Sequence, residues 1–231
     1  MAEPLLEVRD LRVHFETPDG IVKAVDGISF SVEPGERLGV VGESGSGKSV
    51  GFLTVMGLIT RKQARIEGEV LFRGRNLLEL NADEMRSIRG KGIAMVFQDP
   101  LSSLHPLYRV GSQIVEAIRA HEDMSKHAAR DLAVEMLRRV GIPRPDERAR
   151  QYPHEFSGGM RQRAMIAMAL VLNPDLLIAD EPTTALDVTV QRQLLRLLAR
   201  TRAERDTAII LISHDIAVVS QTCERMLVMY A

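Results

Sequence analysis

Apolar and polar positions alternate at the start of the chain, and short continuous apolar runs follow later. Residues 5–15 alternate with an interruption near Asp10, which is typical of a half-buried strand. A turn at residues 17–20 and a second strand-like stretch at 21–30 predict an antiparallel pair. Continuous runs favour strands that are covered on both faces. Further strands are expected at residues 38–42, 66–72, 93–97, 176–179, 208–212 and 226–230.

Helical patterns lie between these strands. The expected helices are residues 48–58, 112–120, 125–140, from Ser157 to the residues before Asn173, 190–202 and 216–222. Residues 98–111 and 144–152 are expected to be connections, and the region 98–156 contains no strand pattern. Buried strands that alternate with helices at both ends of the chain predict an α/β fold with a parallel sheet. The expected core is about 1–97 and 157–231, with a helical insertion at 98–156.

Composition narrows the class of protein. The chain has 231 residues, 45% of them hydrophobic, which suits one globular domain with subdivisions. Its net charge of -1 argues against nucleic acid as a partner, since such binding needs phosphate neutralisation. The single Cys223 excludes an internal disulfide and fits a reducing compartment. We expect no signal peptide and no membrane span, and the apolar run Ala164–Leu172 is interpreted as part of a buried helix.

A glycine-rich loop follows the strand expected at 38–42. It matches G-x-x-x-x-G-K-[ST] in full at Gly42, Glu43, Ser44, Gly45, Ser46, Gly47, Lys48 and Ser49. Glycines let backbone N–H groups face phosphate oxygens, and the helix that starts at Lys48 adds its positive end. Lys48 would reach the β- and γ-phosphates, Ser49 would ligate Mg²⁺, and Val50 completes the expected binding segment.

Two carboxylates follow another buried strand. Asp180 and Glu181 end the run at 176–179, and ligands of open α/β sheets bind at this edge. Asp180 would hold Mg²⁺, and Glu181 would orient or deprotonate an attacking water. By themselves the two residues would also fit ordinary surface acids before Pro182. The phosphate loop favours the functional interpretation.

Two more polar residues stand just past strand-like stretches. Gln98 follows residues 93–97, and His214 follows residues 208–213. A common position after a strand suggests that both face the same ligand edge, although spacing alone fits a simple turn residue equally well. The remaining histidines are scattered, so no zinc site is expected.

Together these residues resemble the ATP-binding domains of ABC transporters. The discriminating segment is 156–163, with Ser157, Gly158 and Gly159, which is similar to the LSGGQ signature. Ser157 is a good N-cap, and the glycines allow close approach to a helix N-terminus, so the segment reads as a second anion site. The resemblance implies that this segment contacts ATP held by a partner domain, so that two domains enclose two ATP molecules.

The resemblance also implies roles for the remaining residues. Phe15 would stack on adenine, with a core aromatic as the alternative. Gln98 corresponds to the Q-loop, which senses Mg²⁺ and transmits to the membrane partner, so it joins Ser49 and Asp180 as a metal-site residue. Asp187 corresponds to the D-loop and His214 to the switch histidine at the γ-phosphate. Glu181, His214, Lys48 and Gln98 would form the catalytic set.

A narrower resemblance is to ATPases of the oligopeptide/dipeptide permease group, which includes nickel importers. It rests on residues 97–106, 152–163 and 180–191, with His105 where that group more often has Asn. It implies a P-loop NTPase fold with a RecA-like parallel core, an N-terminal antiparallel β subdomain and an inserted helical subdomain. Members continue past the position of Ala231, so the C-terminal region of the family is expected to be missing.

The implied function is an ATP-hydrolysing motor at the cytoplasmic face of the membrane. The implied partners are transmembrane permease subunits, a second ABC ATPase subunit (identical or different) and, indirectly, an external solute-binding protein. The transported solute is not identified. The alternative is a soluble ABC ATPase that acts on DNA or ribosomes, but neither coiled-coil heptads nor a second phosphate loop is present. A GTPase would need an Asn-Lys-x-Asp motif, which is absent from the sequence. A small-molecule kinase would not need the segment at Ser157. The presence of Glu181 and His214 argues against a non-enzymatic binding module.

Overall fold

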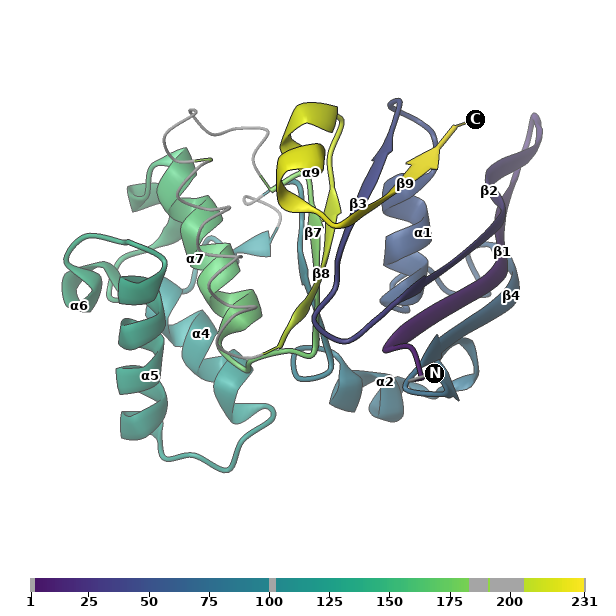
Figure 1. The fold of residues 1–231 in the computed structure, drawn as a ribbon. Coiled ribbons are helices and arrows are strands. Elements are labelled where there is room, and N and C mark those ends of the chain that lie inside the picture. The colour runs from purple at the N-terminus through teal and green to yellow at the C-terminus, as the bar shows by residue number, and fades with distance from the viewer. Residues whose placement is uncertain (1–2, 100–102, 183–190, 192–205, 231) are drawn as a thin grey trace. The chain divides into compact units, whose positions relative to one another are not determined.

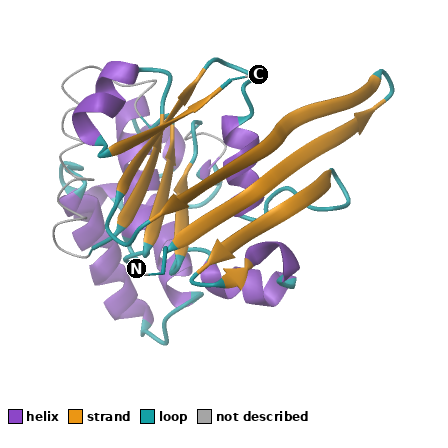
Figure 2. Ribbon diagram, turned by 45° about the vertical axis from the view of Figure 1, so that its right-hand side comes forward, coloured by secondary structure: helices purple, strands orange, loops and turns teal. Residues whose placement is uncertain are grey.

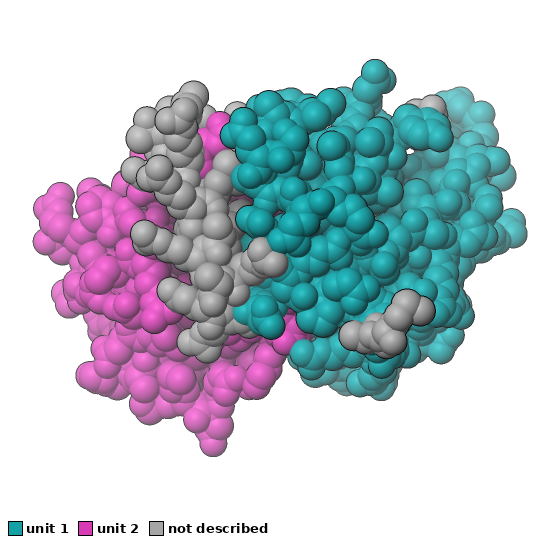
Figure 3. Space-filling model, viewed as in Figure 1, with its two compact units in different colours: residues 1–89, 206–231 teal, residues 90–205 magenta. Residues whose placement is uncertain are grey.

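A computed structural model describes residues 3–99, 103–182, 191 and 206–230 of the chain. The chain divides into two units: residues 1–89 with 206–231, and residues 90–205 (Figure 3).

The first unit begins with an antiparallel sheet in the order β2-β1-β4-β5 (Figure 2). Its strands are β1 (Leu6–Thr17), β2 (Gly20–Val32), β4 (Arg65–Phe72) and β5 (Arg75–Asn76). The predicted antiparallel pair is therefore confirmed. The expected interruption near Asp10 is confirmed as well, because the register of β1 shifts between Val8 and Leu11 and Asp10 has φ 44°. Gly68 faces this bulge, where a Cβ would lie 2.4 Å from the Asp10 carbonyl oxygen.

The same unit contains three parallel strands. β3 (Arg37–Gly42) pairs with β8 (Ala208–Ile212) on one side and with β9 (Arg225–Met229) on the other. α9 (Ile216–Thr222) covers β3 closely, since a Cβ on Gly39 would lie 2.0 Å from a methyl carbon of Val219. The parallel strands predicted at 38–42, 208–212 and 226–230 are confirmed.

α1 (Lys48–Val55) lies between this parallel sheet and the antiparallel sheet (Figure 1). The ring of Phe52 on α1 is 5.8 Å from the ring of Phe30 on β2. The expectation that this helix reaches residue 58 is wrong. Helix α1 ends at Val55 because Met56 is its C-cap and Gly57 adopts a left-handed φ of 63°.

Three short elements of this unit have no counterpart among the expected ones: β5, η1 (Leu77–Glu79) and α2 (Ala82–Ile88). A capping box begins α2: the Asn81 side chain accepts from the Asp83 and Glu84 N–H groups, and the Glu84 carboxylate accepts from the Asn81 N–H. The cap explains how so short a helix holds its first turn.

The second unit contains two buried parallel strands and a group of helices. The strands are β6 (Ile93–Val96) and β7 (Leu176–Asp180), and the helices are α4 (Val110–Arg119), α5 (Lys126–Arg139), α6 (Pro145–Arg148), η2 (Pro153–Glu155) and α7 (Gly158–Leu170). α4, α5 and α7 pack on one another (Figure 1). The expected apolar helix segment is confirmed, since α7 buries Ala164, Met165 and Ile166.

The described part of residues 98–156 contains no strand, in agreement with the expected helical insertion. The connection expected at 144–152 contains a one-turn helix, α6, that was not expected and that Pro145 begins. α4 begins two residues before the expected start at 112. The expected helix at 190–202 lies outside the described residues. Among the helices that the structure describes, none is long and apolar enough to cross a bilayer.

Candidate functional site

The glycine-rich loop runs from the end of β3 to the start of α1. Gly47 is the N-cap of α1 with φ 83°, and Gly45 has φ 86°, so both adopt backbone conformations that favour glycine. A Cβ on Gly47 would lie 2.0 Å from the Ala24 carbonyl oxygen, and one on Gly42 would lie 2.2 Å from the Met229 carbonyl oxygen. Tight packing against β2 and β9 therefore sets the shape of this loop.

Lys48 is held inside the loop that precedes it. Its Nζ donates to the carbonyl oxygens of Gly42 at 2.8 Å and Glu43 at 2.7 Å, and to Ser46 Oγ at 3.2 Å. Only 7% of Lys48 is exposed, whereas Glu43, Ser44 and Gly45 are exposed. A buried ammonium group surrounded by loop oxygens is ready to exchange one of these contacts for an anion at the loop surface.

The first turn of α1 supplies further donors. The first regular backbone bond here runs from the Gly51 N–H to the Gly47 carbonyl oxygen at 2.9 Å. The N–H groups of Lys48, Ser49 and Val50 come before it, at the positive end of the helix. Such a helix start beside a glycine loop is an anion-binding arrangement.

His214 belongs to the same edge of the first unit as this loop. β3 and β8 are parallel with Val40 opposite Ile212, so Gly42 and His214 each come two residues after a matched pair. Ser213 ties the two segments together, because its N–H donates to the Val40 carbonyl oxygen at 3.0 Å. The structure thus places the predicted loop and the predicted histidine at the carboxyl ends of neighbouring strands, with the His214 side chain exposed.

The second unit brings its own pair of predicted residues into contact. Val96 of β6 lies opposite Ala179 of β7, so Gln98 and Glu181 each follow the paired positions by two residues. The Gln98 amide Nε2 donates to Glu181 Oε2 at 3.0 Å. Asp180, one residue earlier, is only 5% exposed.

Glu181 has an unusual backbone. Its φ is 46°, in the left-handed region that non-glycine residues rarely adopt, although Pro182 normally favours an extended residue before it. Strain of this kind persists where the surroundings hold it, and it is concentrated at functional sites. Gln162 is one such support: it is 3% exposed and its Nε2 donates to the Pro182 carbonyl oxygen at 2.9 Å.

The contact of Gln162 with Pro182 was not predicted from the sequence. Gln162 lies within the segment 156–163, but its spacing gives no sign that it contacts residue 182. Its helical position, between the buried residues of α7, is the only available signal.

The segment at Ser157 starts α7 as expected. The Ser157 hydroxyl accepts from the Met160 N–H at 3.3 Å, which confirms the predicted N-cap. A Cβ on Gly158 would meet nothing within 4 Å. Packing within the described chain therefore leaves room for a side chain at Gly158.

Phe15 and Asp187 complete the predicted set. Phe15 lies on β1 opposite Val22 and is partly exposed. Asp187 lies outside the described residues. The phosphate loop and His214 belong to the first unit, and Gln98, Asp180 and Glu181 belong to the second.

Oxygen donors suited to Mg²⁺ occur in both groups. They are the Ser49 hydroxyl in the first unit, and the Gln98 amide oxygen and Asp180 carboxylate in the second. Among the described residues no group of three or more His, Cys, Asp or Glu side chains could hold a metal. In phosphoryl-transfer sites Mg²⁺ takes one or two protein oxygens and completes its coordination with phosphate and water oxygens.

Comparison with known proteins bears on these groups. Residues 25–184 match the family described as ABC transporter. The probable peptide ABC transporter ATP-binding protein y4tR of Sinorhizobium fredii is 54% identical over 231 residues, which cover 100% of this chain and 69% of that protein. The oligopeptide transport ATP-binding protein OppD of Bacillus subtilis is 54% identical over 228 residues, which cover 98% of this chain and 64% of that protein. The chain thus spans about two thirds of the length of these relatives.

Solved structures of ATP-binding cassettes are similar in fold to this chain. A dimeric ATP-binding cassette, MJ0796, in a post-hydrolysis state bound to ADP and phosphate, has a TM-score of 0.87 and 28% identity, covering 97% of this chain and 94% of that chain. The cassette cbiO1 of Clostridium perfringens, part of an ABC transporter complex, has a TM-score of 0.79 and 27% identity, covering 99% of this chain and 85% of that chain. The expected P-loop NTPase fold is confirmed.

Similarity of nearly the whole of this chain to transport ATP-binding proteins confirms the resemblance to the oligopeptide/dipeptide group and sets aside a non-transport ABC ATPase. The chain belongs to the ABC transporter family, as an ATP-binding subunit that hydrolyses ATP to drive transport.

Proposed function

We propose that this chain is the motor subunit of an ABC importer for peptides or a similar small solute. It would act at the cytoplasmic face of the membrane, bound to permease subunits and to a second ATPase subunit. An external solute-binding protein would deliver the cargo. The observation that carries the proposal is the pairing of Gln98 with the strained Glu181 at the end of β7, in a chain whose β3 ends in a complete phosphate loop. Relatives that are 54% and 52% identical to this chain are named as oligopeptide and dipeptide transport ATP-binding proteins, which supports the solute class.

In this proposal the two groups act on one ATP. Lys48 gives up a loop carbonyl and donates to the β- and γ-phosphates, while the N–H groups at 48–50 hold phosphate oxygens. Ser49, Gln98 and Asp180 would hold Mg²⁺, which neutralises phosphate charge when bound. Catalysis is then mostly positioning and charge stabilisation, as in other phosphoryl transfers.

Glu181 would orient or deprotonate the attacking water, with Gln98 holding its carboxylate in place. His214 would steady the γ-phosphate from the end of β8. Phe15 would stack on the adenine, and Asp187 would act at the contact between the two ATPase subunits. Closing of the pair on ATP and reopening after hydrolysis would move the permease through the segment after Gln98.

The open position at Gly158 supports a contact from outside the chain. A side chain there would meet nothing within 4 Å in the described chain, although two glycines follow the Ser157 cap. Glycines in this place are explained if the backbone of α7 approaches ATP bound by the partner subunit.

Two substitutions test the catalytic assignment. Glu181→Gln should retain ATP binding and lower turnover by about a thousandfold or more, because the carboxylate that handles the water is removed. Lys48→Ala should weaken ATP binding because a direct cation is lost from the phosphates. Fluorescent-nucleotide titration and phosphate release measure the two quantities. Wild-type turnover in Glu181→Gln would remove Glu181 from this role, and unchanged affinity in Lys48→Ala would contradict the phosphate-loop assignment.

The solute class needs its own experiment. The ATPase would be purified with its permease in lipid nanodiscs, together with the solute-binding protein, and ATP hydrolysis measured with di- to pentapeptides and with nickel. Peptides should stimulate hydrolysis and nickel should not. Stimulation by nickel alone would reject the peptide assignment while leaving the motor role intact.

A further inference from the structure

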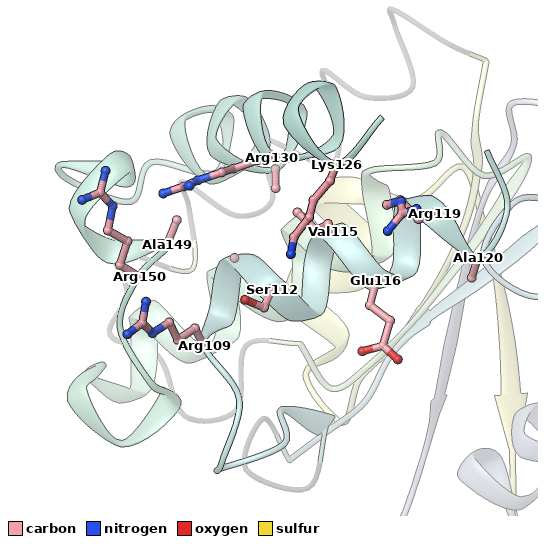
Figure 4. Close-up of a pocket in the computed structure, with 12 residues that line it drawn as sticks. Arg109, Ser112, Val115, Glu116, Arg119, Ala120, Lys126, Arg130, Ala149 and Arg150 are labelled. Carbon is pink, nitrogen blue, oxygen red and sulfur yellow. The ribbon is translucent and has the colours of Figure 1, made fainter. Parts of the chain in front are cut away.

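Gln162 is a buried polar residue on a helix whose other buried residues are all apolar. Only 3% of it is exposed, and it lies in the second turn of α7. Among the described helices of the second unit it is the one buried polar residue. By contrast, Ser112, Glu116 and Lys126, which line the hollow between α4 and α5, are exposed (Figure 4). The burial of Gln162 therefore calls for a specific reason.

The amide of Gln162 has a specific partner. Its Nε2 donates to the Pro182 carbonyl oxygen at 2.9 Å, and both residues are buried. Burial of an amide is unfavourable unless the amide is hydrogen-bonded, so this bond matters to both groups. The two residues are 20 positions apart in the sequence. The bond ties α7 to the segment that directly follows β7.

Gln162 is the middle one of three consecutive residues of α7 that donate to loop carbonyl oxygens. Arg161 donates to Pro153 at 2.9 Å, and Arg163 donates to Gly141 at 2.7 Å. Successive residues of an α-helix point about 100° apart, so the three side chains hold three different segments around α7. Of the three bonds, the one from Gln162 reaches the segment that contains Glu181.

That segment begins with a strained residue. Glu181 has φ 46°, although a residue before proline is normally extended. Such a conformation persists only where the surroundings hold it. The Glu181 carboxylate accepts from Gln98 Nε2 at 3.0 Å, and the carbonyl oxygen of the next residue accepts from Gln162. Glu181 is thus held at its side chain and at the backbone that follows it.

We propose that Gln162 is a positioning residue for ATP hydrolysis, whose bond to Pro182 keeps Glu181 in the conformation that presents its carboxylate to the attacking water. The inference rests on the proposed role of Glu181. Without the bond, residue 181 is free to relax toward the extended conformation that Pro182 favours, and the carboxylate is displaced. A displacement of about 1 Å in a catalytic site can cost about a hundredfold in rate.

Gln162→Met tests the inference, because methionine is of similar length and has no N–H donor. The ATPase is purified with its permease in lipid nanodiscs, phosphate release gives kcat and KM, and titration with fluorescent ADP gives nucleotide affinity. We expect kcat to fall by about ten- to a hundredfold. Nucleotide affinity should stay within about twofold of wild type, because the phosphate loop is unchanged. Gln162→Asn, whose amide is one methylene shorter, should lower kcat as well, and it serves as the test if the methionine variant does not fold.

A control separates positioning from a general loss of stability. Asn76→Ala removes another amide that bonds to the backbone, since Asn76 Oδ1 accepts from the Val70 N–H at 3.2 Å and the Leu78 N–H at 3.3 Å. Asn76 lies in the first unit, on β5, and has no assigned part in ATP hydrolysis. This variant should unfold more easily in a thermal melt but keep kcat within about twofold of wild type.

A double substitution shows whether Gln162 acts through Glu181. Glu181→Gln lowers turnover by removing the carboxylate, so Gln162→Met in that background should cause no further loss in single-turnover phosphate release. A role in folding alone would lower the residual rate by the same factor in both backgrounds.

Three results would overturn the inference. Wild-type kcat in Gln162→Met and Gln162→Asn, while Glu181→Gln has lost turnover, would reject the positioning role and leave the proposed function intact. An equal loss of kcat in Asn76→Ala, or an equal further loss in the Glu181→Gln background, would make Gln162 a general support for folding. Wild-type turnover in Glu181→Gln would reject the proposed role of Glu181 itself, and this inference with it.

Discussion

At the residue scale, two glycines of the phosphate loop differ in what confines them. Gly45 and Gly47 both have positive φ, but only Gly47 lies against another strand, with a Cβ position 2.0 Å from the Ala24 carbonyl oxygen. Around Gly45 the space is open to 4 Å. Gly47→Ala should therefore combine backbone strain with a clash against the backbone of β2.

We predict that Gly45→Ala lowers the free energy of unfolding by about 1–2 kcal/mol, the cost of a left-handed alanine, and that Gly47→Ala lowers it by clearly more. Urea denaturation of the two variants measures the difference, and Gly45→Ala is the control for backbone strain alone. Equal losses would show that the contact with Ala24 does not constrain the loop.

The single cysteine provides a second prediction at this scale. Burial raises the pKa of the Cys223 thiol, and the hydrogen bond with Thr222 only partly opposes this. Because the thiolate is the reactive form, alkylation by iodoacetamide near pH 8 should be slower in the native chain than in urea. Mass spectrometry is unambiguous because the chain has one cysteine. Equal rates would contradict the raised pKa.

The direction of the pKa shift also determines a pH effect. The folded chain holds the Cys223 proton more tightly than the unfolded chain does, since its pKa is the higher of the two. The stability linked to this proton is fully present below the unfolded pKa. It declines as the pH rises from the unfolded toward the folded pKa, and Cys223→Ser should remove that part of the pH dependence.

At the element scale, the caps show what local sequence can and cannot reveal. The Asn81 and Glu84 spacing is a readable capping box, yet α2 has only seven residues and little periodicity to announce it. The Ser157 cap was predicted because serine is a good N-cap and a helix was expected to begin there. Short elements such as α2, α6 and β5 depend on packing against neighbouring elements. The local sequence of a short element does not show which neighbours it will pack against.

We predict that Asn81→Ala lowers the free energy of unfolding by about 1 kcal/mol, because two N–H groups of α2 lose their acceptor. Chemical denaturation measures the loss. Asn81→Asp should retain most of the stability, since its carboxylate accepts the same two bonds. Asp83→Ala, which removes an exposed ion pair with Arg86 but neither capping bond, is the comparison, and an equal loss there would reject the capping explanation.

The buried strands could be predicted from local sequence, but the pairing of their ends could not. Residues 38–42, 93–97, 176–179 and 208–212 were predictable as strands because buried parallel strands are apolar throughout. Their parallel direction places Gly42 with His214 and Gln98 with Glu181 at matched ends. The register that aligns these pairs is a property of the sheets and not of any single segment.

At the scale of the whole molecule, the open surface at Gly158 gives a prediction about assembly. Gly158→Asp should leave stability and ATP binding by the isolated chain unchanged, because the new side chain meets nothing in the described chain. If α7 meets ATP of a second subunit, a carboxylate there repels the γ-phosphate. ATP-dependent dimerisation and hydrolysis should then be lost.

Size-exclusion chromatography of the Glu181→Gln chain with ATP, with and without Gly158→Asp, measures this effect. Gly158→Ala is the matched control and should dimerise nearly as well, because it adds volume without charge. A dimer that persists in the aspartate variant would place the subunit contact elsewhere on the chain.

The sequence by itself determined the phosphate loop, the Ser157 cap, the ends of the buried strands and the helical insertion, because each depends on local pattern or on chemistry carried by consecutive residues. Only the tertiary structure decided the left-handed Glu181, its bond with Gln98 and the contact of Gln162 with Pro182. These features join residues far apart in the chain, and packing and sheet register, which no local pattern encodes, bring them together.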